Sequence, residues 1–134
     1  MSELQLEIVT PKKIVSTPVV VCSCPGVAGE FGVLKDHISL LSALKIGALH
    51  YRTKESNEEH YVFVSGGFAD VNNNVLTVLA ESAENAKDID AARAEAAKKR
   101  AEARLASRDE NIDRARAQAA LNRALVRLSL ANAR

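Results

Sequence analysis

The sequence predicts a two-part β + α fold: an N-terminal antiparallel β-sandwich of about ten short strands, followed by a C-terminal antiparallel two-helix hairpin. All six glycines and all three prolines lie before residue 68, where they separate short apolar runs, as in an antiparallel β protein. The second half is rich in Ala, Arg and Glu and has no glycine or proline, which favours continuous helices. We therefore expect a β-sandwich domain over residues 1–84 and a helical hairpin over residues 85–134.

Short patterns place the strands. Leu4, Leu6 and Ile8 alternate with polar residues, which indicates a half-buried strand. The apolar run 19–24 ends at a Pro-Gly pair and predicts a strand buried on both faces. Because it lies in this run, the pair Cys22 and Cys24 is expected to be reduced and buried.

Turn signals join the remaining strands. The polar segment 53–59 separates two apolar runs and predicts a hairpin between 46–52 and 60–65. The run 72–74 consists of three asparagines, which tolerate the left-handed conformation of a tight turn. The pair Gly66 and Gly67 predicts a bend or bulge in a strand, because no helix start follows it.

The helices begin after a polar stretch. Asp88 or Asp90 can cap a helix that runs to about Leu105. The segment 107–110 has the S-x-x-E form of a capping box and predicts the start of a second helix. The apolar positions of both helices are mostly alanine, so the helices should form readily yet bury little area against each other; examples are Ala92, Ala96, Ala103, Ala115 and Ala119.

Composition excludes several classes of protein. The net charge of +1 argues against binding of nucleic acid through bulk electrostatics. No apolar run approaches the roughly 20 residues of a membrane helix, and residues 1–10 lack a signal-peptide pattern. Two cysteines and three scattered histidines do not make a metal site. We expect a soluble, non-exported protein without direct membrane insertion and without a metal.

Arginines recur on the helices at steps of seven and four residues. These steps keep the side chains on one line along each helix, so each helix carries a stripe of guanidinium groups. One interpretation is a solvated face, paired locally with Glu95, Glu102 and Asp113. The other is an anion or phosphate site where the stripes converge. The stripes consist of Arg93, Arg100 and Arg104, and of Arg116, Arg123, Arg127 and Arg134.

Three motifs carry a resemblance to a known family. The segment 29–41 resembles the G-E-x-G-x-L-P-x-H-A-P-L-L signature of the epsilon subunit of F-type ATP synthases. The segments 65–71 and 89–94 resemble that family's second signature and its I/L-D-x-x-R-A motif. Lys35 and Ser39 stand where the family usually has proline. The resemblance covers essentially the whole chain.

This resemblance implies a non-catalytic subunit of the rotor in a bacterial, proton-translocating ATP synthase, at the cytoplasmic face of the plasma membrane. The β-sandwich would bind the gamma subunit and the ring of c subunits, coupling ring rotation to the catalytic head. By position, Glu30 and Phe31 match the contact to the c-ring, and His37 matches a position near gamma. The C-terminal hairpin would hinder ATP hydrolysis when it extends toward the alpha and beta subunits.

In some bacterial relatives the folded hairpin binds ATP, and the resemblance implies ATP as a regulatory ligand; no cofactor is required. The alternative function is a stand-alone ATP-sensing binding module. The sequence has no Walker loop and no nucleophile beside a base, so we expect no independent catalysis. The positions that match the nucleotide contacts are Glu84, Asp90, Arg93, Arg116, Arg123 and Arg127.

Overall fold

The computed structural model describes residues 3–56 and 58–133. The chain divides into two compact units, Met1–Asn85 and Ala86–Arg134. The first unit contains strands and the second contains helices, so the predicted β + α order is confirmed.

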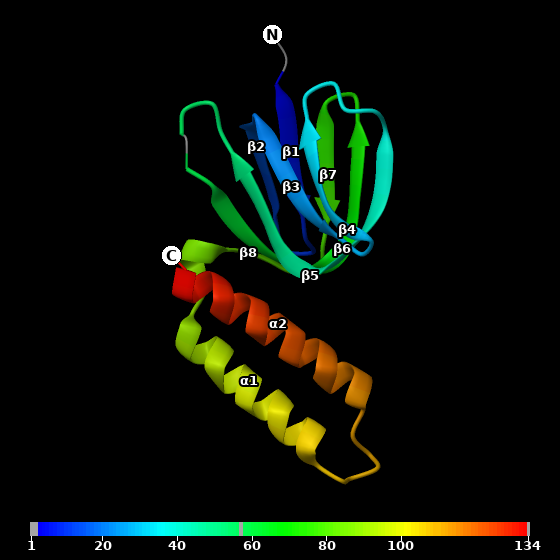
Figure 1. The fold of residues 1–134 in the computed structure, drawn as a ribbon, viewed down its shortest axis with the longest axis vertical. Helices are drawn as coiled ribbons and strands as arrows, with labels where there is room; N and C mark the ends of the chain where they lie inside the picture. Colours follow the sequence, from blue (N-terminus) through cyan, green and yellow to red (C-terminus); the bar gives the residue numbers. More distant parts are fainter. Residues whose placement is uncertain (1–2, 57, 134) are drawn as a thin grey trace. The chain divides into compact units, whose positions relative to one another are not determined.

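Eight strands of the described residues form the first unit (Figure 1). They make one hydrogen-bonded sheet in the order β2-β1-β7-β6-β5-β3-β4, with β8 pairing beside β6. The sheet curves around a single apolar core, which makes it a sandwich. The strands are β1 (Leu4–Val9), β2 (Ile14–Val19), β3 (Val21–Gly26), β4 (Gly29–Leu34), β5 (Leu40–Arg52), β6 (His60–Asn72), β7 (Val75–Leu79) and β8 (Ala83–Asn85).

Two details differ from the expectation of about ten short antiparallel strands. β5 and β6 each run for 13 residues, so fewer and longer strands build the described sheet. β1 and β7 pair in parallel, whereas the other pairs are antiparallel. This arrangement is available because β1 and β7 are far apart in sequence, so the chain between them can return to the same end of the sheet.

A bend at two adjacent glycines allows β6 to pair with three other strands. β6 pairs with β5 along most of its length, with β8 over 62–64 and with β7 over 68–72. Gly66 and Gly67, between these two stretches, have φ angles of 98° and 131°. A Cβ atom on Gly67 would lie 1.8 Å from the carbonyl oxygen of Leu79. Glycine is required there both by conformation and by close packing.

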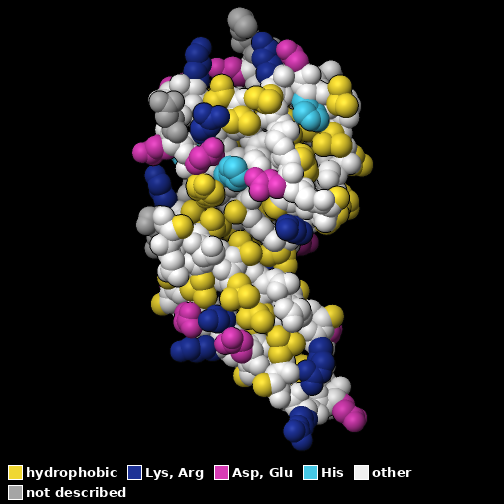
Figure 2. Space-filling view, in the orientation of Figure 1, with side chains coloured by type: hydrophobic (Ala, Val, Ile, Leu, Met, Phe, Trp, Pro, Cys, Tyr) yellow, Lys and Arg dark blue, Asp and Glu magenta, His cyan; other side chains and the backbone are white. Residues whose placement is uncertain are grey.

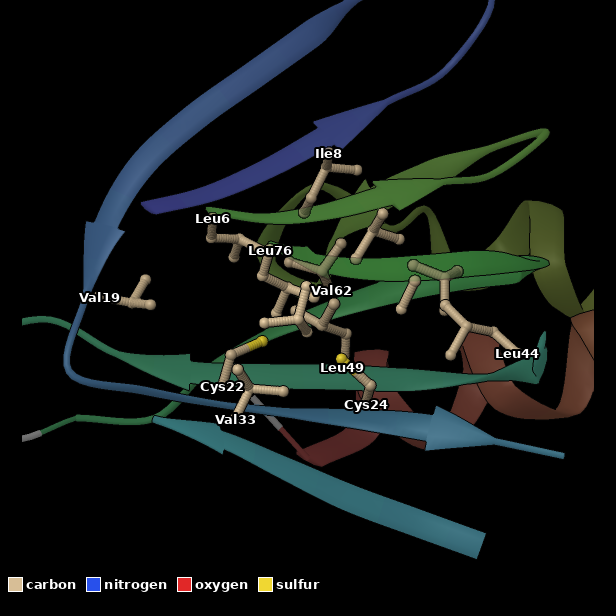
Figure 3. Close-up of a cluster of buried hydrophobic side chains, with 14 of the residues drawn as sticks. Leu6, Ile8, Val19, Cys22, Cys24, Val33, Leu44, Leu49, Val62 and Leu76 are labelled. Carbon is tan, nitrogen blue, oxygen red and sulfur yellow. The ribbon is translucent and has the colours of Figure 1, made fainter. Parts of the chain in front are cut away.

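The core of the first unit is built from alternate residues of its strands (Figure 3). Leu4, Leu6 and Ile8 are buried while their neighbours are half-buried, which confirms the period-two prediction for β1. Cys22 and Cys24 are free thiols in this core, also as expected. Burial and the hydrogen bond to Cys24 raise the pKa of the Cys22 thiol far above its usual range.

The prediction of one strand over 19–24, buried on both faces, is wrong. β2 ends at Val19 and β3 begins at Val21, with the exposed Val20 between them. Over residues 21–24 burial alternates between half-buried and buried, whereas Pro25 and Gly26 are both buried. Val20 pairs through its backbone N–H with the carbonyl of Arg52 (2.9 Å) instead.

Both predicted turns join strands as expected. β5 and β6 pair with His50 opposite Tyr61, which confirms the longer hairpin. Asn57 of its predicted turn lies outside the described residues. Asn73 and Asn74 have φ angles of 51° and 63°, as a tight hairpin turn requires.

The second unit consists of a 3₁₀ turn, Ala86–Asp88, and two helices, α1 (Ala91–Ala106) and α2 (Arg114–Ala133), which pack against each other. Of the two candidate caps, Asp90 is the one used. Its carboxylate accepts a hydrogen bond from the backbone N–H of Arg93 at 3.1 Å. This bond satisfies one of the four free N–H groups at the helix start.

The predicted capping box at 107–110 is wrong. Ser107 is the C-cap of α1 and has extended backbone angles, while α2 begins only at Arg114. Asp113 provides the cap of α2 by accepting from the N–H of Arg116 at 3.0 Å. The guanidinium of Arg114 donates to the carbonyls of Leu105 (2.7 Å) and Ser107 (2.6 Å). These bonds satisfy the end of α1 and hold the segment 107–113 as a turn.

The seam between the helices consists of small residues seven positions apart. The alanines that are buried differ from those named in the sequence analysis, which lie on exposed or half-buried sides of the helices. Seven residues are nearly two turns, so each set forms one line along its helix. The helices can approach closely, but each alanine buries little area. The buried seam residues are Ala94, Ala101, Ala117, Ala124 and Ala131.

This division of the core predicts that the first unit folds by itself. Removal of residues 86–134 should leave a sandwich with β-type circular dichroism and a cooperative thermal transition, because the sheet core is made within residues 4–83. The full-length chain is the control. A truncated chain without a cooperative transition would contradict the prediction.

Candidate functional site

The first candidate site surrounds Glu30, on the face of β4 that points away from the core. Its side chain is 61% exposed. One carboxylate oxygen accepts hydrogen bonds from the Ser23 hydroxyl on β3 and from Nε2 of His50 on β5, the latter at 2.8 Å. Three neighbouring strands therefore fix the position of this carboxylate. Within residues 3–56 and 58–133, the hydrogen bonds to this group all go to that one oxygen.

His50 lies between two carboxylates. Its Nδ1 is 3.2 Å from a carboxylate oxygen of Glu59, which precedes β6, while its Nε2 faces Glu30. The ring stacks on Tyr61 with centroids 5.3 Å apart, and Arg52 contacts the other oxygen of Glu59 at 3.5 Å. Figure 2 shows a histidine with acidic side chains on either side of it over the strands. We call Glu30, His50, Glu59 and Arg52 the charged cluster.

The contacts of the charged cluster shift two pKa values. The hydrogen bond from Ser23, followed by that from His50, lowers the pKa of Glu30. Partial burial alone would lower the pKa of His50, but its hydrogen bonds to Glu30 and Glu59 outweigh that effect, so the pKa of His50 is raised. Both shifts favour the charged forms of the pair.

Phe31 does not share the surface of Glu30. Successive side chains of a strand point to opposite faces, and Phe31 is half-buried against the core. The structure therefore separates the two residues that the resemblance places at the c-ring. Glu30 alone carries the exposed polar group of this segment.

His37 lies in a loop that is fixed at both ends. Its backbone N–H donates to Leu34, and its Nδ1 lies 2.6 Å from the carbonyl of Ile38, so Nδ1 carries the hydrogen. Asp36, with a φ angle of 64°, donates its N–H to the side chain of Asn74 at 2.6 Å. The Asn74 amide donates back to the Asp36 carboxylate at 3.3 Å. This pairing holds a loop that lacks the prolines usual in the resembled family.

The outer face of the other strands carries a row of apolar side chains that sequence reasoning missed. Five strands place one residue each in adjacent register, on the face opposite the core. Phe68 is 54% exposed, Leu79 is 49% exposed and Ile14 is 71% exposed. Exposed apolar side chains that lie next to one another are typical of interaction surfaces. We call these residues the apolar row: Ala43, Phe68, Leu79, Val9 and Ile14.

The second unit presents its arginines on one face. Arg93 and Arg100 directly precede the buried seam residues of α1, and Arg116 and Arg123 directly precede those of α2. In two antiparallel helices, residues one position before a seam residue point to the same side of the helix pair. Within residues 3–56 and 58–133 these four guanidinium groups make no ion pair. The expected pairing with Glu95, Glu102 and Asp113 is absent from these residues.

The predicted nucleotide contacts do not all come together. Arg93 is in the first turn of α1, level with the last part of α2, where Arg123 and the half-buried Arg127 lie. Arg116 is in the first turn of α2, 11 residues before Arg127 and so about 17 Å from it along the helix at 1.5 Å per residue. Asp90 is engaged as the cap of α1. Glu84 belongs to β8 of the first unit.

Comparison with known proteins follows the division of the chain. Residues 3–86 match the family described as ATP synthase, Delta/Epsilon chain, beta-sandwich domain. Residues 87–132 match the family described as ATP synthase, Delta/Epsilon chain, long alpha-helix domain. This chain belongs to the ATP synthase delta/epsilon family. The resemblance drawn from the three motifs is confirmed, and with it the expectation of a non-catalytic subunit.

Curated relatives in this family are named ATP synthase epsilon chain. The protein of Nitratidesulfovibrio vulgaris (strain DP4) is 61% identical over 77% of this chain and 76% of its own length. The protein of Lawsonia intracellularis is 54% identical over 80% of each chain. The protein of Desulfatibacillum aliphaticivorans is 52% identical over 96% of this chain and 92% of its own length.

Solved structures share the fold. A chain of the Euglena gracilis mitochondrial ATP synthase, titled OSCP/F1/c-ring in rotational state 1, superposes with a TM-score of 0.82 at 24% identity. That match covers 98% of this chain and 82% of the other. A chain of the Tetrahymena thermophila mitochondrial ATP synthase, titled central stalk/cring, superposes with a TM-score of 0.65 at 12% identity and covers 97% of each.

Two negative findings concern the described residues of this delta/epsilon family member. No helix among them is long and apolar enough to cross a membrane. No group of His, Cys, Asp and Glu side chains among them could hold a metal ion.

Proposed function

We propose that this chain is the epsilon subunit in the rotor of a bacterial F-type ATP synthase, at the cytoplasmic face of the plasma membrane. Its sandwich binds the gamma subunit and the ring of c subunits, and it couples proton-driven rotation of the ring to ATP synthesis in the catalytic head. Its relatives at up to 61% identity are named epsilon chains, and a structural neighbour is titled central stalk/cring.

The apolar row is the observation that carries this proposal. A rotor subunit must hold its partner firmly enough to turn with it, so its contact surface needs a well-packed apolar centre. The row supplies Phe68 and Leu79 at its middle and spans five strands of a rigid sheet. We assign it to the gamma subunit. Glu30 and its free carboxylate oxygen, on the separate surface of β4, face a basic loop of the c-ring.

The hairpin adds a regulatory part. α1 and α2 have 16 and 20 residues, which laid end to end span about 54 Å at 1.5 Å per residue. Their alanine seam buries little area, so an extended arm is accessible at modest cost. Extended along the central stalk, the arginine face would contact acidic surface of the stationary alpha and beta subunits and resist rotation. In that state the arm hinders ATP hydrolysis.

A second candidate function is ATP binding by the folded hairpin. Arg93 and Arg123 lie on the same face and near the same end of the hairpin, and neither is neutralised by an ion pair in the described residues. Guanidinium groups bind phosphate oxygens through two parallel hydrogen bonds. A ligand at 100 times its Kd would stabilise the folded arm by about 2.7 kcal/mol. The same site would serve a stand-alone ATP sensor or a sensor within the complex.

Replacement of Phe68 by glutamate tests the assignment of the apolar row. A charge at the centre of an apolar contact must be desolvated, so affinity for the gamma subunit should fall at least about tenfold. The matched control is Val20→Glu, which changes a similarly exposed apolar residue outside the row. Surface plasmon resonance gives the affinities, and thermal melting checks the fold. Equal affinity of both variants would remove the row from the interface.

Deletion of residues 86–134 tests the regulatory role. In a complex reconstituted with the truncated subunit, the rate of ATP hydrolysis at saturating substrate should rise several-fold, because the arm no longer resists rotation. Proton-driven synthesis should persist, because the sandwich still couples gamma to the ring. The control is the complex rebuilt with the full-length chain. Unchanged hydrolysis would assign no inhibitory action to this hairpin.

Calorimetry on the isolated chain tests ATP binding. Alanine at both Arg123 and Arg127 should abolish the heat of binding, because both arginines approach one end of the hairpin. Arg116→Ala should change affinity by less than about twofold, since a nucleotide at that end does not reach it. Arg108→Ala in the turn is the control for loss of charge alone. No heat of binding by the unmodified protein at millimolar ATP would refute this second function.

A further inference from the structure

We propose that His50 is a proton switch that sets the charge which Glu30 offers to a cationic partner. Protonated His50 neutralises the charged cluster and weakens binding of the partner, whereas neutral His50 leaves the cluster negative and strengthens it. The inference rests on the proposed function only for the partner's identity, the basic loop of the c-ring. The switch itself follows from the arrangement around the ring.

Both ring nitrogens of His50 face a carboxylate oxygen, at 2.8 Å to Glu30 and 3.2 Å to Glu59. An ionised carboxylate only accepts hydrogen bonds, and both imidazole nitrogens donate only when the ring is protonated. The neutral ring turns one lone pair toward an anionic oxygen. The arrangement is therefore complementary to the imidazolium form.

The charged groups around His50 come from β4, from the residue before β6 and from β5 itself. These groups are Glu30, Glu59 and Arg52, respectively. Lys45 acts on Glu30 from a distance, while Ser23 and Tyr61 contribute uncharged contacts. With the imidazolium present, the two carboxylates of the charged cluster are balanced by two cations. Loss of one proton leaves a net negative charge beside the exposed oxygen of Glu30.

The direction of the effect follows from linkage. The contacts of His50 raise its pKa, so the imidazolium persists to a higher pH than in an ordinary histidine. The proton leaves as the pH rises through that raised value. A partner cation and this proton therefore compete for the same carboxylate surface. Binding of the partner lowers the pKa of His50, and a rising pH favours binding by the same coupling.

The protein contains two other histidines that serve as internal references. His60 stacks on Tyr51 with centroids 5.1 Å apart, and His37 contacts a backbone carbonyl. Neither makes an ion pair within the described residues. NMR titration of the full-length chain should give His50 a pKa above the usual value of a histidine, with the signals of the other two rings recorded in the same spectra. Glu30→Gln should lower the pKa of His50, because it removes one of the two carboxylates that raise it.

Affinity for the isolated c-ring supplies the second measurement. Between pH 5.5 and pH 8.5 at constant ionic strength, the affinity of the unmodified chain should rise about two- to threefold relative to that of His50→Gln. Glutamine keeps a hydrogen-bonding group at this position but cannot gain a charge. His60→Gln, at a histidine outside the charged cluster, should follow the unmodified chain. Because every variant binds the same c-ring, the ratio of their affinities removes the effect of titration within the c-ring.

The outcomes separate the switch from the proposed function. An ordinary pKa for His50 that Glu30→Gln does not change would overturn the switch. Parallel pH profiles for the unmodified chain and His50→Gln would overturn its action on the partner. If Glu30→Gln binds the c-ring as tightly as the unmodified chain at every pH, the c-ring contact fails instead, and the titration alone then decides the switch.

Discussion

The antiparallel pairing of β5 with β6 is the constraint on which the rest of the first unit depends. β3 and β4 attach to β5, while β7, β1 and β2 attach through β6, so every strand takes its position from this ladder. Gly67 lets β6 approach Leu79 closely enough to pair on both sides. Opposite ends of the same ladder carry the two candidate surfaces: His50 beside Tyr61, and Ala43 beside Phe68. The placement of both candidate surfaces thus follows from one strand pair.

The second unit is held together by different forces. Its seam consists of alanines, and at the helix ends Asp90, Asp113 and Arg114 satisfy backbone groups. These caps act within each helix and do not depend on contact between the helices. The first unit loses its core if its strands separate, whereas α1 and α2 lose little. This contrast suits a chain in which one part is an anchor and the other moves.

Local chemistry made part of this structure predictable. The glycine boundary at residue 68, the Asp90 cap and the asparagine turn each act within a few residues, so sequence reasoning found them. The capping box at Ser107 failed because Arg114, seven positions later, bonds the end of α1 and Asp113 caps the next helix. The apolar row could not be predicted from the sequence, because its members are single residues on separate strands that only the strand register brings together. Glu30 was identified only by resemblance, and His50, twenty positions away, had no local signal.

In the turn between the helices, side chains accept hydrogen bonds from two backbone N–H groups. The N–H groups of Asp109 and Asn111 bond to the side chains of Ser107 and Asp109, at 3.2 and 2.9 Å. In one unbroken helix these same N–H groups would bond to the carbonyls of Leu105 and Ser107, which Arg114 now occupies. Straightening the segment would therefore give these two N–H groups backbone acceptors and would release the Arg114 guanidinium and the Ser107 and Asp109 side chains to solvent. The turn and a continuous helix through it therefore differ in which groups accept from these two N–H groups, not in whether the N–H groups are bonded.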